Sequence, residues 1–516
     1  MCMKKILKNG MLLGCVCAML ITGCGQQNGA TVSDNTEQQK TETAKKTFEG
    51  ATLIELSDTE ILVDGAAISE DAEGIVYAAK DIIYYEDGQN FTYGEGEEGD
   101  AHSKEEADAH TVVHITKAGT YELRGSLSAG QIAVDLGKDA KEDPKAVVTL
   151  ILNGVDIECT VAPAVIFYNV YECGDTDVEN AVSTVDTTAA GANVLIADDT
   201  INNVSGSYVA RIYKPDSVVL NEAETEVEDA KKLHKYDAAF YSKMSMNING
   251  DEKGTGELNI QAENEGLDTE LHLTINGGQI SIVSGNDGIN TNEDEVSVTT
   301  VNGGTLTIRV TGETGEGDGI DSNGWLVMNG GTIVAEGCGF SMDAGIDSDM
   351  GIHMNGGVVM ATGNMLDHIS ESTQNYAVFQ FASNQKGGQT YTLKDRSGKE
   401  VLKCTPENDF SYLILSSDMP AGIYTLWQDE QQLAGSVGSQ MMGGMPGGFM
   451  PQGMQIPEGM EIPEEMKIPE GMEIPEGMKR PQGNRGGFGN MESAEVSTEF
   501  EILEGGSYFN NVRIAE

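Results

Sequence analysis

Four aligned segments decide the fold: TINGGQISI at residues 274–282, TVNGGTLTI at 300–308, VMNGGTIVA at 327–335 and HMNGGVVMA at 353–361. A shorter copy begins at Asn249, and the five asparagines stand 27, 26, 27 and 26 residues apart. A fixed period of this length is typical of stacked supersecondary units, each of which buries the hydrophobic face of its neighbour. The chain is therefore predicted to be a solenoid whose regular part covers residues 271–364.

The apolar residues around each Asn-Gly-Gly have a period of two. In residues 306–310, Leu-Thr-Ile-Arg-Val, apolar and polar side chains alternate, which is the pattern of a half-buried strand. Apolar residues recur before each asparagine and after each second glycine, at Ile248, Ile275, Val301, Met328 and Met354 and at Ile280, Leu306, Ile333 and Val359. About 26 residues suit three strands and three turns, so we predict an all-β parallel β-helix with these residues stacked in its core. A leucine-rich repeat has a similar period, but its leucine pattern is missing.

A second motif runs along another edge of the predicted coils. It reads Glu265-Gly266-Leu267-Asp268, Asn286-Asp287-Gly288-Ile289-Asn290, Asp318-Gly319-Ile320-Asp321 and Asp343-Ala344-Gly345-Ile346-Asp347-Ser348-Asp349. We expect the glycine to form a turn, the Ile or Leu to point inward and the carboxylates to point outward. Carboxylates stacked about 4.8 Å apart repel one another unless a cation lies among them, and hard oxygen donors favour calcium. The alternative is that Asp and Asn stand here only as turn formers.

The N-terminal segment is typical of an export signal. Three lysines precede an apolar run at residues 11–21, which ends in Ile21-Thr22-Gly23-Cys24. This ending resembles the bacterial lipoprotein box, which implies cleavage before Cys24 and lipidation of that cysteine. We therefore predict a signal peptide at 1–23, a flexible tether at 24–47 and a location on the extracellular face of the cell membrane.

Composition limits the partners. The formal net charge is −52 and no basic patch is visible, so nucleic acid is excluded as a partner. A polyanionic glycan would be repelled too, unless calcium bridges its carboxylates to those of the protein. Outside the signal and Cys24, the cysteines are Cys159, Cys173, Cys338 and Cys404. Their pairing stays open, because four cysteines allow three connectivities. We expect a monomer.

The rest of the chain divides around the solenoid. Residues 48–110 are predicted to be an N-terminal cap and 111–376 the β-helix, from which residues 223–235 form an exposed excursion. Residues 377–516 are predicted to be a small C-terminal β cap, interrupted at 440–490 by a disordered insertion rich in Met, Pro and Gly. Its strands are expected at residues 377–382, 389–394, 400–404, 411–416, 422–428, 499–503 and 508–514.

Several sequence segments resemble those of a known family. They are VVHITKAGTYEL (112–123), QIAVD (131–135), VVTLILNGVDI (147–157) and AFYSK (239–243), followed by the Asp-Gly-Ile turns. Over residues 111–364 the chain resembles the carbohydrate-binding parallel β-helix family of clostridial surface proteins, which is similar to family 9 polysaccharide lyases. The resemblance implies a right-handed β-helix, bound calcium and binding of cellulose or polygalacturonate without cleavage.

The resemblance also implies positions for metal ligands. The Asp-Asp-x-x-Asp motif of the lyases falls on Asn286, Asp287 and Asn290, with Asp268 from the preceding coil. Asparagine stands at two of the motif's three aspartate positions in this chain, which puts a tight lyase-type site in doubt. The predicted metal ligands are Asp268, Asp287, Asn290, Asp318, Asp321, Asp343, Asp347 and Asp349, and the last five keep the most charge.

The sequence argues against catalysis. No lysine occurs between Gly254 and Gln385, so a lysine base is missing from this face, and an arginine such as Arg309 rarely releases its proton. We expect Arg309, His272 and His353 to lie on the surface. A general acid needs a raised pKa, whereas solvated or calcium-bound carboxylates would have lowered ones. Trp325, beside Asn323, could stack on a sugar ring or pack under a loop.

The predicted function is therefore non-catalytic binding of a polysaccharide by a lipid-anchored surface protein that uses calcium. Trp325, Arg309 and Asn323 are the predicted ligand-binding residues. The alternatives are a calcium-dependent pectate-type lyase and a surface adhesin or scaffold with a protein partner.

Overall fold

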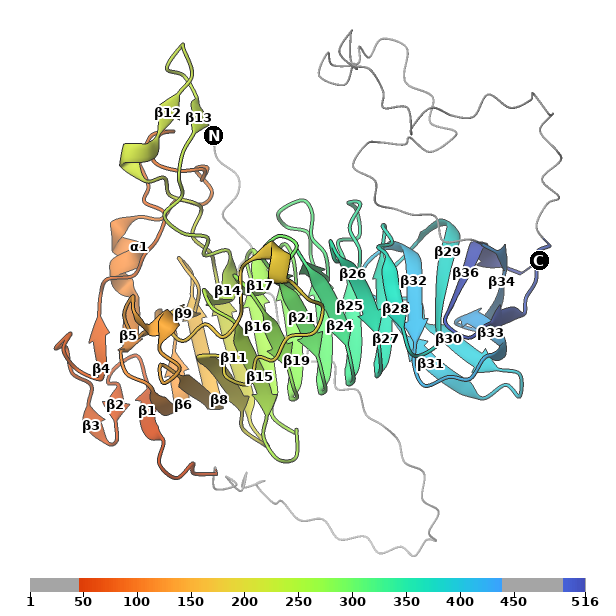
Figure 1. Cartoon of the computed structure of the whole chain (residues 1–516), viewed down its shortest axis with the longest axis horizontal. Coiled ribbons are helices and arrows are strands. Elements are labelled where there is room, and N and C mark those ends of the chain that lie inside the picture. Colours follow the sequence, from red (N-terminus) through yellow and green to blue (C-terminus); the bar gives the residue numbers. More distant parts are fainter. Residues whose placement is uncertain (1–45, 439–494, 516) are drawn as a thin grey trace, which may run out of the picture. The chain divides into compact units, whose positions relative to one another are not determined.

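The computed structural model describes residues 46–438 and 495–515 and shows an all-β protein with large mixed sheets (Figure 1). All described residues belong to one compact unit, which begins at Lys46. The predicted signal peptide, the lipidation site Cys24, almost all of the tether and the insertion at 440–490 lie outside the described residues. In the described part of the chain, no helix is long and apolar enough to cross a membrane.

The repeat region consists of three ladders of parallel strands. The first ladder contains β10 (Ala192–Ile196), β15 (Met246–Gly250), β18 (Leu273–Ile275), β21 (Val298–Val301), β24 (Trp325–Met328) and β26 (Gly351–Met354). The second contains β11 (Ile201–Gly206), β16 (Glu257–Ala262), β19 (Gln279–Ser284), β22 (Thr305–Val310), β25 (Thr332–Glu336) and β27 (Val358–Gly363). The third contains β5 (Thr111–Ile115), β7 (Gly130–Asp135), β9 (Val165–Asn169), β14 (Ala238–Ser242), β17 (Glu265–Thr269), β20 (Ile289–Thr291) and β23 (Ile320–Ser322).

The predicted register of the apolar residues is confirmed. In the first ladder, Ile275 pairs with Ile248 on one side and with Val301 on the other, and the series continues to Met328 and Met354. The second ladder aligns Ile280, Leu306, Ile333 and Val359 in the same way. All of these side chains are buried, so the repeat stacks like residues on like.

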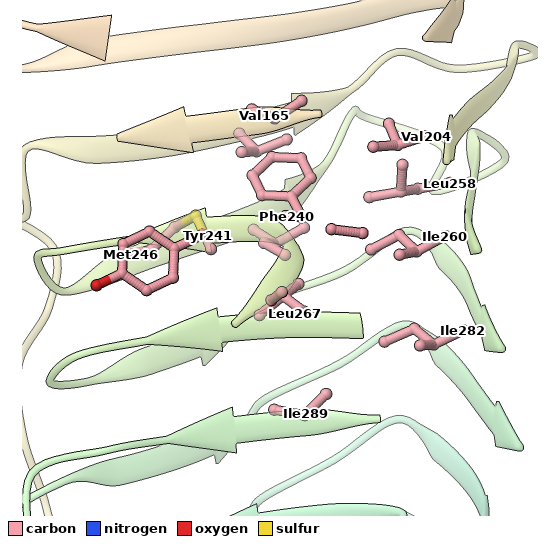
Figure 2. Packing of buried hydrophobic residues seen from close by; sticks show 14 of the residues in the cluster. Val165, Val204, Phe240, Tyr241, Met246, Leu258, Ile260, Leu267, Ile282 and Ile289 are labelled. Atoms are coloured by element: carbon pink, nitrogen blue, oxygen red, sulfur yellow. The ribbon is translucent and has the colours of Figure 1, made fainter. Parts of the chain in front are cut away.

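The hydrophobic core lies between the second and third ladders in the part shown in Figure 2. Val165, Phe240, Leu267 and Ile289 of the third ladder face Val204, Leu258, Ile260 and Ile282 of the second ladder. Each of these side chains is at most 2% exposed. Successive repeats therefore bury their apolar faces in one continuous core.

Each Asn-Gly-Gly forms a turn that requires both glycines. The second glycine has a positive φ, from 81° at Gly331 to 94° at Gly278, a region that favours glycine. A Cβ on the first glycine would meet the backbone of the preceding repeat, at 2.5 Å from the Asn302 oxygen for Gly330. The motif recurs because the backbone of one turn lies directly on the next.

Longer strands and short hairpins precede the regular repeats. Strands β6 (Gly119–Leu127) and β8 (Val148–Cys159) pair in parallel, and β1 (Thr52–Leu56) pairs in parallel with β6. Strand β4 (Val76–Ala79) closes the third ladder with an antiparallel pair to β5. The remaining early elements are β2 (Leu62–Val63), β3 (Ala66–Ala67) and α1 (Lys104–Ala109), whose N-terminus is held by a capping box of Ser103 and Glu106. The predicted excursion at residues 223–235 contains β13 (Val227–Asp229), which pairs antiparallel with β12 (Val219–Leu220) just before the excursion.

The last strands have a second core and pair mainly antiparallel. They are β29 (Tyr376–Gln385), β30 (Tyr391–Asp395), β31 (Glu400–Cys404), β32 (Phe410–Ser416), β33 (Gly422–Gln428), β34 (Gln431–Val437), β35 (Phe500–Ile502) and β36 (Gly506–Ile514). Strand β28 (Ile369–Ser372) pairs in parallel with β26 and so continues the first ladder. The seven predicted strands are confirmed within a few residues, while β34 was not predicted. Phe379, Phe410, Phe500 and Phe509 are buried in this second core. The exact domain boundaries stay predictions.

Candidate carbohydrate and cation site

The third ladder places acidic side chains in register on its outer face. Residues Tyr241, Asp268, Asn290 and Asp321 are successive neighbours across β14, β17, β20 and β23. The residues just before Asp268, Asn290 and Asp321 are Leu267, Ile289 and Ile320, all fully buried in the core. The predicted inward direction of the Ile and Leu side chains is thus confirmed, and alternation turns the acids the other way. We call the set Glu265, Asp268, Asp287, Asn290, Asp318, Asp321, Asp343, Asp347 and Asp349 the acidic column.

Hydrogen bonds tie the acids to the backbone of neighbouring turns. The Asp287 carboxylate accepts from the backbone N–H of Asp318 at 2.7 Å, and the Asp318 carboxylate accepts from that of Ala344 at 2.5 Å. Asp343 in turn accepts from the backbone N–H of Gly317 at 2.8 Å. Each carboxylate is therefore held in place by the repeat next to it.

The acids are buried, so the lowered pKa values expected of a solvated row of carboxylates do not occur in the calcium-free protein. Burial, followed by repulsion from neighbouring carboxylates, raises the pKa of Asp318 to about 9 and that of Asp347 to about 8. Burial raises the pKa of both Asp287 and Asp321 to about 7. The sequence cannot show how closely turns crowd around the acids, and this crowding removes water that would stabilise the charges. Only Asp349 stands exposed at the edge of the column.

Four oxygen atoms of the column are buried and have no hydrogen-bond partner: Glu265 Oε2, Asp268 Oδ2, Asn290 Oδ1 and Asp347 Oδ1. Asp268 and Asn290 are direct neighbours across β17 and β20, and the Asn290 amide donates to Glu265 Oε1 at 3.2 Å. Carboxylate and amide oxygens are ligands that calcium takes, so the donor chemistry fits this ion. Within residues 46–438 and 495–515, no three His, Cys, Asp or Glu side chains form a ready metal-binding group. An ion here would depend on amide, backbone or water oxygens as well.

One lysine that was not among the predicted site residues interacts electrostatically with acids of this region. Lys235, which precedes β14, favours the charged forms of Asp268 and Glu270. Glu270 also accepts a 2.5 Å hydrogen bond from the hydroxyl of Tyr241. The absence of lysine between residues 254 and 385 was the reason for expecting no lysine base on this face, but Lys235 comes from outside that range.

The predicted ligand-binding residues do not gather into one site. Arg309 lies 3.2 Å from the Glu407 carboxylate, an ion pair with the C-terminal strands. Asn323 donates to the Asn292 carbonyl and to Asp294, and Trp325 is half-buried at the start of β24. The predictions for His272 and His353 were wrong, because both are buried; His272 Nδ1 accepts from the backbone N–H of Val298 at 3.1 Å.

Two exposed apolar side chains that precede Asp343 in the chain are not among the residues predicted from the sequence. Phe340 and Met342, in the loop that leads to Asp343, are 69% and 72% exposed. A Cβ on Gly312 would lie 2.7 Å from the Phe340 ring, so the ring occupies space that only glycine leaves open. A large aromatic ring held in solvent next to carboxylates can stack on a sugar. The signal was present in the sequence as an aromatic residue in a glycine-rich turn.

The four cysteines whose pairing the sequence left open are free thiols in the described structure. Cys159, Cys338 and Cys404 are buried and Cys173 is partly exposed. Burial raises the pKa of Cys159 and Cys404 to about 12, which keeps these thiols protonated and unreactive.

Comparison with known proteins identifies a family for this chain. A family model described as "Carbohydrate-binding domain-containing protein" matches residues 109–402. Among solved structures, the chain is similar to the polysaccharide lyase-like protein from C. thermocellum, determined as a gadolinium derivative, with 18% identity, a TM-score of 0.33, and coverage of 58% of this chain and 90% of that one. No curated protein sequence matches. Since the family model spans more than half of the chain, the protein belongs to the family of carbohydrate-binding domain-containing proteins.

Proposed function

We propose that this protein is a lipid-anchored surface protein that binds a plant cell-wall polysaccharide, such as polygalacturonate or cellulose, without cleaving it. Membership of a carbohydrate-binding family supports the class of ligand. The acidic column supports a role for calcium, and the sequence Ile21-Thr22-Gly23-Cys24 supports lipidation and export. A uronate-containing ligand would bind along the column, with Phe340 as the aromatic contact.

The proposed scaffold is a right-handed parallel β-helix. Strands of the three ladders follow one another in a fixed order along the chain, as in β18, β19 and β20, and then β21 and β22 of the next repeat. Each strand pairs in parallel with its counterpart one repeat away. This order is what three-stranded coils require, and the predicted period of about 26 residues supports it.

The observation that carries the proposal is the set of unpartnered oxygens in the acidic column. Buried oxygens such as Asp268 Oδ2 and Glu265 Oε2 are costly without a partner, and repulsion among neighbouring carboxylates adds to that cost. Calcium, when bound, would supply positive charge to these oxygens and to the carboxylate of a uronic acid. Asp268, Glu265 and Asn290 would hold it at one end of the column, and Asp318, Asp321 and Asp347 would do so further along.

Calorimetric titration of residues 24–516 with polygalacturonate, with calcium and again after chelation, tests the proposal. We expect binding that requires calcium and is weakened at least tenfold by the double substitution Asp318→Asn/Asp347→Asn. The matched control is Asp199→Asn, which removes an exposed carboxylate paired with Lys253 outside the column. Calcium-independent binding would contradict the cation role, and a failure to bind any glycan would favour an adhesin with a protein partner.

A pectate-type lyase is the second candidate, favoured by the position of Lys235. A lysine is able to take a proton from the carbon next to a uronate carboxylate if it lies within reach. The raised pKa values of the column also remove the argument that no carboxyl group here could serve as an acid. Continuous absorbance in the near ultraviolet during incubation with polygalacturonate and calcium would detect an unsaturated product. A signal that Lys235→Met abolishes would establish the lyase, and a flat trace supports the non-catalytic proposal.

A further inference from the structure

A cleft lies on the outer face of the first ladder, away from the acidic column of the third ladder. Its volume is about 390 Å³, and its wall is formed by residues 183–188. The floor consists of outward-facing residues from β15, β18, β21 and β24, because the residues between them, such as Ile275 and Met328, are buried in the core. The regular repeat and this loop together form the cleft.

One side of the cleft is a continuous row of side-chain amides. Asn276 donates to Asn249, Asn302 to Asn276, Asn329 to Asn302 and Asn355 to Asn329, with N···O distances of 2.9 to 3.0 Å. Each bond uses one N–H and one lone pair, and an amide has two of each. The four later asparagines are exposed, so their second N–H and second lone pair are open to a ligand.

A second row, of one asparagine, two threonines and one valine, runs beside the amides. Asn247, Thr274, Thr300 and Val327 are neighbours in register across the first ladder. The hydroxyl of Thr187 lies 2.7 Å from both Asn247 Oδ1 and Thr274 Oγ1, and the Asn247 amide donates to the Thr187 carbonyl at 2.7 Å. These buried hydrogen bonds hold the wall against the floor, so this end of the cleft is formed before any ligand binds.

The cleft differs from the rest of the protein in its charge. Asp186, which is exposed on the wall, is the one ionisable residue among those that line it, in a chain of net charge −52. A polyanion finds no cation here and faces the field of an acidic protein. Amides and hydroxyls instead match the alternating donors and acceptors of neutral sugar hydroxyls. Because equivalent amides repeat at about the strand spacing of 4.8 Å, they suit a linear polymer more than a single small molecule.

We propose that this amide-lined cleft binds a neutral, linear glycan chain of the β-glucan class, separately from the acidic column. The inference rests on the proposed function in taking a cell-wall glucan such as cellulose as the ligand, and it adds a separate site for that polymer. Under this proposal one protein holds two kinds of cell-wall polymer: an uncharged one on the first ladder and a uronate-containing one, through calcium, on the third.

Calorimetric titration with cellohexaose tests the proposal on the double variant Asn302→Asp/Asn329→Asp. We expect the affinity for cellohexaose to fall at least tenfold, because two donors are lost and two charges enter the cleft, while calcium-dependent binding of polygalacturonate is unchanged. Asn259→Asp is the matched control, since Asn259 donates to Asn203 across the second ladder at 3.0 Å but does not line the cleft. Unchanged affinity in a double variant that melts like the wild type would overturn the proposal.

Hydrogen exchange on the wild-type protein avoids any effect of the substitutions on folding. Cellohexaose should slow exchange in residues 183–188 and in the Asn-Gly-Gly turns, whereas polygalacturonate with calcium should not. Protection confined to the acidic column, or no binding of cellohexaose by the wild type, would refute the cleft as a glucan site. Either result would leave the polygalacturonate proposal standing if that polymer still binds.

Discussion

The carboxylate of Asp287 accepts a hydrogen bond from the backbone N–H of Asp318, 31 residues later, so one acid helps to position the next. Asp318 makes the same kind of bond to Ala344. These bonds lower the pKa values of the two acids, but burial acts more strongly in the opposite direction. The fold thus holds carboxyl groups rigidly in a place where their charged forms are unfavourable.

The calcium-free protein should lose stability as the pH rises from about 4 to about 9. A carboxyl group with a pKa higher in the folded protein than in the unfolded chain stabilises the fold below its unfolded pKa, which is 3.8 for Asp, and loses that contribution as the pH approaches its folded pKa. For Asp347 and Asp318 the loss extends to pH 8 and 9. Thermal unfolding in chelator across this range measures it. Calcium at pH 8 should restore the melting temperature, and a calcium-free protein that gains stability from pH 5 to 9 would contradict the expectation.

Asp318→Asn should raise the melting temperature in chelator at pH 8.5 by about 2 to 4 °C and leave it unchanged at pH 4. The amide keeps the acceptor for the Ala344 N–H but carries no charge. The same substitution should reduce the stabilisation by calcium. Asp199→Asn serves as the control and should show no such gain, because hydrogen bonds to Lys253 and Thr255 lower the pKa of that exposed carboxyl. Equal melting temperatures for the wild type and Asp318→Asn at pH 8.5 would contradict the claim that the charged form of Asp318 is unfavourable in the folded protein.

Phe340→Ala should weaken polysaccharide binding about threefold to tenfold, the value of one aromatic contact, without changing the melting temperature. The ring is 69% exposed and so contributes little to the core. Affinity by titration and thermal unfolding give the two quantities. Phe91→Ala is the matched control, since Phe91 is 50% exposed in the N-terminal part of the chain. Equal losses of affinity in both variants would show that Phe340 has no specific role.

Gly288→Ala should destabilise the protein by about 1 to 3 kcal/mol, because the new methyl group has no room. A Cβ there would lie 2.1 Å from Ile308 Cγ2 and 2.5 Å from the Gly319 oxygen. Denaturant unfolding measures the change. Gly99→Ala, where a Cβ meets no atom within 4 Å, should be nearly neutral. If the two substitutions have the same effect, the repeats are less tightly packed than the structure indicates.

The parallel ladders could be predicted because the same pattern of apolar residues and glycines recurs in every repeat. Ile275 and Val301 are aligned by a period of 26 residues, and the positive φ of Gly278 and Gly304 explains why glycine recurs at one position. Strand alternation also gave the inward direction of Ile289 and Ile320. These properties are local or periodic, so the sequence contains them directly.

The character of the site could not be predicted in the same way. Alternation correctly turned Asp268 and Asp321 away from the core, but it does not report how much chain covers them, and Asp268 is fully buried. Alternation likewise suggested that His272 and His353 were on the surface, whereas irregular segments such as residues 174–190 cover part of the outer face. The role of Lys235 depends on a contact between an irregular segment and a repeat, and no periodicity encodes such contacts.

The hydrogen-bonded row of asparagines has a consequence for how such a protein can change its length. Each amide donates to the one before it, so the row has a direction, and every interior member is satisfied by identical neighbours. Duplication of one repeat, for instance residues 276–301, would insert a further amide with its bonds already provided, and would extend the cleft by one step. Duplication of whole repeats within this segment would therefore lengthen the proposed binding surface in steps of one repeat, without any new kind of contact.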